Sequence, residues 1–165
     1  MRTGQKYFLA AVLALACAWK VQAQDDVWAR VKEVNFPEKS LQASWHRVYK
    51  SPLLQDAVES EGKVSLTQPD RVRWETIKPV QHVTVLDGTQ PRGRFLLPTE
   101  KDFRVTVLEG DQYTIQLDPV RRDLKQLVSQ IALTVEKNTY KLLYITILGV
   151  DGDWTQIRFT HVVME

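Results

Sequence analysis

The residue types that most often carry catalysis or bind metal ions are scattered in this sequence. The three histidines, His46, His82 and His161, lie far apart in the chain, and none belongs to a group with metal-ligand spacing. The sequence also contains no Gly-rich phosphate loop, nucleophile elbow or paired-carboxylate motif. We therefore expect a protein that is not an enzyme and that needs no cofactor or metal ion.

Two local patterns invite a chemical interpretation but favour a structural one. His161 shares an alternating face with Ile157, Phe159 and Val163, so it is interpreted as a histidine at the rim of a core. The stretch DGDW, residues 151–154, superficially resembles a calcium loop. It lacks the length and the later acidic ligand of such a loop, and it predicts a hairpin turn instead.

The stretch PDRVRWETIKP, residues 69–79, alternates between two faces. Val72, Trp74 and Thr76 fall on one face, and arginine and glutamate side chains fall on the other. A period of two predicts a strand with a mostly apolar face and a charged face. From the periodicity alone, Trp74 belongs either to the protein's own core or to a surface that receives a ligand.

The rest of the chain predicts one helix followed by a β-meander. Val27, Val31 and Val34 have helical spacing after an acidic first turn, and Pro37 closes that segment. Leu124, Leu127 and Val128 predict a further short helix. Tight-turn residues separate alternating segments, as in Asp87-Gly88, which indicates antiparallel neighbours. The predicted strands are Leu41–Tyr49, Gly62–Thr67, Arg71–Ile77, Gln81–Leu86, Phe103–Leu108, Gln112–Leu117, Ile131–Glu136, Lys141–Leu148 and Thr155–Val163.

The first 23 residues have the pattern of a cleaved signal peptide. A basic start is followed by the apolar run from Tyr7 to Trp19 and by VQA, which ends at Ala23. The alternative is a lipid anchor on Cys17, the single cysteine of the sequence. Cleavage would leave residues 24–165 as a single domain. Of the 22 Lys and Arg residues, three lie in the signal, so 19 would remain against 20 Asp and Glu, a net charge of −1. Such a balance argues against nucleic acid as a partner.

The segment EGKVSLTQPDRVRWETIKPVQHVTVLDG, residues 61–88, resembles the signature region of the LolA family of periplasmic outer-membrane lipoprotein carriers. The shared features are Gly62, Pro69, the pair Val72 and Trp74, Pro79, the pair Val83 and Val85, and the Asp87-Gly88 turn. The flanks SWHRVYKSPLLQDAVESEG and YTIQLDP, and the meander IALTVEKNTYKLLYITILGVDGDWTQIRF, are also similar. The resemblance covers most of residues 26–163.

This resemblance implies a mainly β fold with helices (α+β), in which a curved antiparallel sheet forms an incomplete β-barrel covered by the N-terminal helix and a short lid helix. It implies a periplasmic, monomeric carrier whose apolar cavity holds the acyl chains of a lipidated protein, taken from an inner-membrane exporter to an outer-membrane acceptor. Trp74 would then face the cavity. The candidate lining residues are Val64, Leu66, Val72, Trp74, Val83, Val85, Phe103, Val105, Ile115, Leu133, Ile145, Ile157 and Phe159.

Two departures from the family pattern keep other functions open. Gln68 precedes Pro69 where the family commonly has an arginine that helps to hold the lid, so this latch is absent or made differently. The segment TQPRGRFLLPTEK before Phe103 is shorter than usual, which suggests a smaller or more open cavity. The alternatives are a related carrier of another amphiphile, such as a glycolipid or polyene lipid, and an interaction or sensing domain that holds no cargo.

Overall fold

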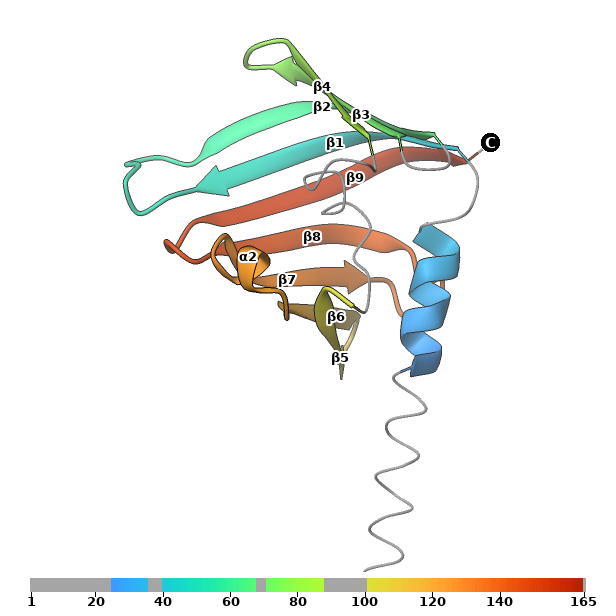
Figure 1. Cartoon of the computed structure of the whole chain (residues 1–165). Helices are drawn as coiled ribbons and strands as arrows, with labels where there is room; N and C mark the ends of the chain where they lie inside the picture. The colour runs from blue at the N-terminus through green and yellow to red at the C-terminus, as the bar shows by residue number, and fades with distance from the viewer. Residues whose placement is uncertain (1–24, 36–39, 68–70, 88–100, 165) are drawn as a thin grey trace, which may run out of the picture.

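The computed structural model describes residues 25–35, 40–67, 71–87 and 101–164. This part of the chain begins with a helix, residues 25–35, and continues as nine strands with one short helix among them (Figure 1). The elements after the first helix are β1 (Leu41–Lys50), β2 (Val58–Thr67), β3 (Arg71–Lys78), β4 (His82–Asp87), β5 (Phe103–Glu109), β6 (Tyr113–Pro119), α2 (Arg122–Lys125), β7 (Val128–Val135), β8 (Leu142–Gly149) and β9 (Trp154–Met164).

The nine strands form one antiparallel sheet in the order β4-β3-β2-β1-β9-β8-β7-β6-β5. The sheet is curved and does not close, because β4 and β5 lie at its two opposite edges (Figure 1). The predicted fold class is confirmed, and every predicted strand is present. The largest differences in bounds are at β2, which begins at Val58 rather than Gly62, and at β7, which begins at Val128 rather than Ile131.

Several predictions from the sequence fall on other parts of the chain. These predictions lie outside the described residues. They concern the predicted signal peptide with Cys17, the residue Pro37, the pair Gln68 and Pro69, and residues 89–100 of the shortened segment. Within the described ranges, no helix is both long and apolar enough to cross a membrane.

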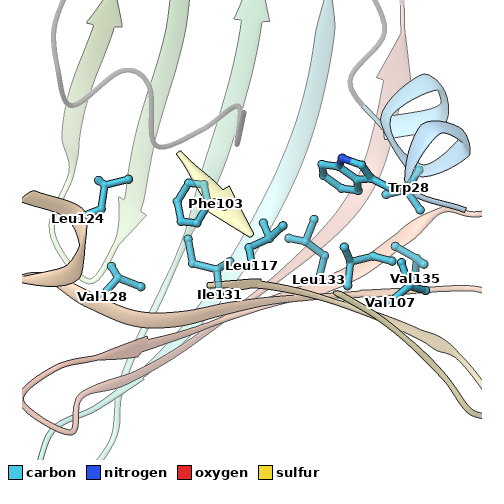
Figure 2. Close-up of a cluster of buried hydrophobic side chains, with 11 residues drawn as sticks. Trp28, Phe103, Val107, Leu117, Leu124, Val128, Ile131, Leu133 and Val135 are labelled. Atoms are coloured by element: carbon cyan, nitrogen blue, oxygen red, sulfur yellow. The ribbon is translucent and has the colours of Figure 1, made fainter. Parts of the chain in front are cut away.

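The main core packs the first helix against the half of the sheet that contains β5, β6 and β7. Trp28 and Val31 of the helix contact the buried side chains of these strands, among them Ile115 and Leu133 (Figure 2). Val31 is on the predicted apolar face, whereas Trp28 extends that face by one position. Asn35 fixes the end of the helix. Its amide nitrogen donates to the carbonyl oxygens of Val31 and Tyr140, at 2.9 and 2.7 Å, and its amide oxygen accepts from the backbone N–H of Leu142 at 2.7 Å.

The predicted short helix is present, but it is a single turn. Leu124 of α2 is buried in the main core, whereas Leu127 is 61% exposed and Val128 already belongs to β7. The helical spacing of these residues is overridden because Val128 pairs with Gly149 in the sheet. Arg121 holds the turn in place through ion pairs with Asp102 and Asp123, and the hydrogen bond from Arg121 lowers the pKa of Asp123.

A second, smaller cluster lies on β1, β2 and β3. Its buried members are Ala43, Trp45, Val64 and Val72. Trp45 pairs with Gly62 across β1 and β2, and the register of β2 against β3 shifts between Glu61 and Gly62. A Cβ atom at Gly62 would lie 1.8 Å from the carbonyl oxygen of Glu75 and 2.7 Å from Cζ2 of Trp45. The strands can therefore approach this closely only because residue 62 has no side chain.

We predict that Gly62→Ala destabilises the protein by about 1–3 kcal/mol, because the new methyl group must displace the backbone of β3 or the ring of Trp45. The measurement is the free energy of unfolding in urea. Gly110→Ala is the matched control, since a Cβ atom there meets its nearest neighbour at 3.6 Å and should change stability by less than about 0.5 kcal/mol. Equal effects of the two substitutions would contradict the close approach at Gly62.

Candidate functional site

A pocket of about 630 Å³ lies at the end of the sheet where β1 begins and β2 and β9 end. This is the end beside the first helix, drawn in blue, and the C-terminus (Figure 1). The part of the lining that comes from β1, β2 and β3 is apolar throughout, and Phe159 of β9 adjoins it. The side chains from these three strands are Leu41, Ala43, Val64, Leu66, Val72 and Trp74.

Further apolar lining comes from the first helix and from β8. Val34 ends the apolar face of the helix, and Leu142, Leu143 and Ile145 follow one another along β8. Polar side chains complete the lining, and they are Asn35, Glu136, Lys141, Thr160 and His161. Because the walls are apolar and the charges are few, the pocket is suited to bind a hydrocarbon chain and unsuited to bind a highly charged ligand.

Trp74 belongs both to the pocket and to the second cluster. Its ring stacks on Trp45 with the centroids 4.7 Å apart and an angle of 27° between the planes. Trp45 is 2% exposed, and its indole N–H has no hydrogen-bond acceptor within the described part of the chain. Trp45 is thus a core residue, whereas half-buried Trp74 covers it and presents its other side to the pocket.

An irregularity in β9 shapes the rim. Gln42 pairs with Val163 and Ser44 pairs with Thr160, so two residues of β9, His161 and Val162, lie opposite Ala43. His161 takes up the extra residue with a left-handed backbone, φ 52°. Bulges of this kind redirect side chains. As a result the consecutive residues Thr160, His161 and Val162 all line the pocket, where a regular strand would contribute alternate residues.

The structure divides the candidate lining residues of the sequence analysis into three groups. Six of them line the pocket, and they are Val64, Leu66, Val72, Trp74, Ile145 and Phe159. The second group belongs to the two clusters. The main core buries Phe103, Ile115 and Leu133, and Val105 packs against it (Figure 2 shows Phe103 and Leu133). Ile157 packs against the second cluster. Phe103 and Val105 also border a second hollow of about 520 Å³ beside Trp28.

The remaining two candidates, Val83 and Val85, are on the other face of the sheet, which corrects the expectation from the sequence. Val83 pairs with Glu75 and Val85 pairs with Arg73, and residues directly opposite each other share a face. The two valines are 39% and 46% exposed. Alternation separated the two faces of β4, but the sequence did not show which face of this edge strand is turned inward.

The contribution of the first helix and of the start of β8 to the pocket was not predicted from the sequence. Val34 was assigned to an apolar helical face, but nothing in its spacing showed that this face continues into a pocket. Lys141 and Leu142 follow the Lys137-Asn138 turn, and their place at the pocket could have been inferred from the pairing of the strands. β8 pairs with β9 in an antiparallel arrangement, so the start of β8 must lie at the end of β9.

We predict that two leucine-to-alanine substitutions separate core from pocket. Leu133→Ala should lower the free energy of unfolding by about 2–5 kcal/mol, because it empties a fully packed site in the main core. Leu66→Ala should cost less than about 1.5 kcal/mol, because that side chain already borders open space. Urea unfolding of both variants measures the difference, and similar losses would mean that the pocket wall is packed like the core.

Comparison with known proteins places this fold. No family model matches the chain. Over 81 residues the sequence is 32% identical to an outer-membrane lipoprotein carrier protein from Photobacterium profundum; the match covers 49% of this chain and 38% of that relative, well under half of its length.

Solved structures show the likeness over a longer range. A LolA superfamily protein from Nitrosomonas europaea matches with a TM-score of 0.52 at 10% identity, over 86% of this chain and 93% of that chain. A domain named for outer-membrane lipoprotein sorting, from Vibrio parahaemolyticus, has a TM-score of 0.49 at 8% identity, over 87% and 93% of the two chains. The resemblance noted in the sequence is confirmed, and the chain has the fold of the LolA superfamily, an open antiparallel sheet with a few helices.

Proposed function

We propose that this protein is a carrier that shields acyl chains in the pocket beside Trp74, and that its cargo is a lipidated protein. The observation that supports the proposal is the apolar wall itself. Apolar side chains from β1, β2, β3 and β9 border about 630 Å³ of space that the side chains of the described residues leave open. A domain that only stabilised itself would bury these side chains against one another, since interiors are close-packed.

The energetics of acyl chains explain why such a space is useful. Each methylene that leaves water gains about 0.8 kcal/mol, so a chain of about 15 methylenes costs on the order of 12 kcal/mol to expose. A carrier must shield the chain and also release it. Apolar walls with few polar anchors meet both demands, because their attraction is distributed over many weak contacts.

The same proposal includes the location of the protein and its partners. The relative from Photobacterium profundum is named an outer-membrane lipoprotein carrier protein. We propose for this chain a periplasmic location, with residues 24–165 as a single monomeric domain after signal cleavage. It would accept cargo from an inner-membrane exporter, deliver it to an outer-membrane acceptor, and catalyse no reaction. The open pocket favours a carrier over an interaction domain without cargo.

The first test is native mass spectrometry of the full chain, exported with its own leader and purified from a bacterial periplasm without detergent. We expect a protein mass that matches residues 24–165 together with a co-purifying acylated mass. A cargo-free mass that stays unchanged after addition of a lipidated peptide or free lipid would contradict the proposal.

The second test compares two tryptophans. Trp74→Ala should remain folded and weaken binding of a fluorescent acyl probe about tenfold, because it removes a large apolar surface from the pocket wall. Trp154→Ala is the matched control. Trp154 lies at the start of β9, the opposite end of that strand from the pocket, and its loss should leave probe binding unchanged. Equal weakening by both variants would place the probe elsewhere.

A further inference from the structure

We propose that the end of the sheet opposite the pocket docks onto a neutral lipid surface, the interface of a zwitterionic bilayer. Four connections meet at this end of the strands, and Figure 1 draws all of them on the left. They are residues 51–57 between β1 and β2, 79–81 between β3 and β4, 120–127 around α2, and 150–153 between β8 and β9. The pocket lies at the other end of the same strands, so this docking site is distinct from it.

Each of these connections exposes a large apolar side chain. We call Leu53, Val80, Leu127 and Val150 the apolar tips. The first three are 94%, 72% and 61% exposed, and no other large hydrophobic residue of the described ranges is as exposed. Turns ordinarily carry glycine and small polar residues. Residues 110–112 and 136–141, the two described turns at the pocket end, expose no large hydrophobic side chain, so the apolar tips are confined to one end of the sheet.

The apolar tips follow the order of the strands along one edge of the molecule. A Cβ atom at Gly152 would lie 3.2 Å from Cγ of Pro52, so the connections that carry Val150 and Leu53 are in close contact. The backbone N–H of Val150 donates to the carbonyl oxygen of Leu127 at 3.4 Å. The turn with Val80 continues this row beyond β2, because β3 and β4 are the next strands in the sheet.

Aromatic and cationic side chains lie directly behind the apolar tips, at the ends of the strands. Nζ of Lys50 is 5.8 Å from the ring centroid of Trp154, the first residue of β9. The hydroxyl of Tyr49 donates to the carboxylate of Asp153 at 2.8 Å. Tryptophan and tyrosine are enriched where hydrocarbon gives way to headgroups, and lysine extends its ammonium group from there into water. Apolar tips backed by such residues match the layers of a bilayer interface.

The charge of the four connections favours a neutral lipid surface. They contain three basic residues against four acidic ones, a net charge of −1, so opposite charge attracts neither an anionic membrane nor an acidic protein. The basic residues are Arg121, Arg122 and Lys125, and the acidic residues are Asp56, Asp123, Asp151 and Asp153.

The spacing of the apolar tips favours a bilayer over a protein partner. Polar residues separate the tips along the chain, among them Gln55, Gln81 and Asp151. The buried centre of a protein interface is depleted of charged residues, and it requires continuous shape complementarity. A bilayer interface is fluid, so each tip can enter it separately while headgroups and water solvate the polar residues between the tips.

The experiment measures flotation of the full exported chain with lipid vesicles, in low and in high salt. One set of vesicles is phosphatidylcholine, and the other contains equal parts of phosphatidylcholine and phosphatidylglycerol. We expect the protein to bind both, with partition coefficients that agree within about twofold at either salt concentration, because salt screens charges and leaves apolar contacts in place.

A pair of double variants locates the contact. Leu53→Gln with Val80→Gln should lower the partition coefficient at least about tenfold, because it removes two apolar side chains from the lipid. Leu108→Gln with Val163→Gln is the matched control, since these residues are also exposed but lie at the pocket end of β5 and β9, and it should leave vesicle binding unchanged. Both double variants should unfold at the same urea concentration as the unmodified protein.

The outcomes are distinct from those that test the pocket. Binding to neither kind of vesicle would overturn the proposal and direct the apolar tips to a protein partner. Binding only to the anionic vesicles, or equal loss in the two double variants, would also overturn it. Binding of a fluorescent acyl probe without vesicles should be the same for the tip variant and the unmodified protein, so failure of the carrier function would leave this proposal standing.

Discussion

The stack of Trp74 on Trp45 is the contact on which the pocket depends. Trp45 fills the space above Gly62, and the missing side chain at that position lets β3 approach until a Cβ atom would lie 1.8 Å from the carbonyl oxygen of Glu75. The register of β2 and β3 shifts at the same place, and such irregularities bend a sheet. The bend brings Val72 and Trp74 to the same pocket as Phe159 of β9, which a flat sheet would hold apart. The buried indole N–H of Trp45, which has no acceptor within the described ranges, is a cost of this arrangement.

The two clusters of buried residues differ in size. Eleven buried residues on the first helix and on β5, α2, β6 and β7 form the main core, whereas the cluster beneath the pocket has four. Local stability rises with the number of buried apolar contacts, so we expect β1, β2 and β3 to open locally more readily than the main core. Such a division would suit the proposed carrier function, because one half of the sheet would hold the fold together while the other half adjusted its wall to a chain.

Much of this arrangement could be predicted from the sequence, and the failures have physical reasons. Period-two alternation located all nine strands, because each strand of an antiparallel sheet has two chemically different faces. Alternation did not show which face is inward, so Val83 and Val85 were expected in the cavity and are on the outer face. It also could not separate Leu133, which is core, from Leu66, which borders the pocket, since both are inward leucines. The bulge at His161 lies where β9 pairs with β1, a strand far away in the sequence, and no local pattern predicts it.

The apolar wall and the polar residues at the rim of the pocket affect ligand binding in different ways. The curved sheet provides an apolar wall, and apolar contact is roughly proportional to area and nearly indifferent to what a chain is attached to. The wall can therefore decide whether a chain binds, but it discriminates weakly among cargoes of similar length. Discrimination requires a directional or charged group close to the place where the chain ends. Among the described residues of the lining, such groups belong to Asn35, Glu136, Lys141, Thr160 and His161. A few residues at the mouth of such a pocket can thus change which ligand binds, so likeness of fold alone does not identify a ligand for this chain.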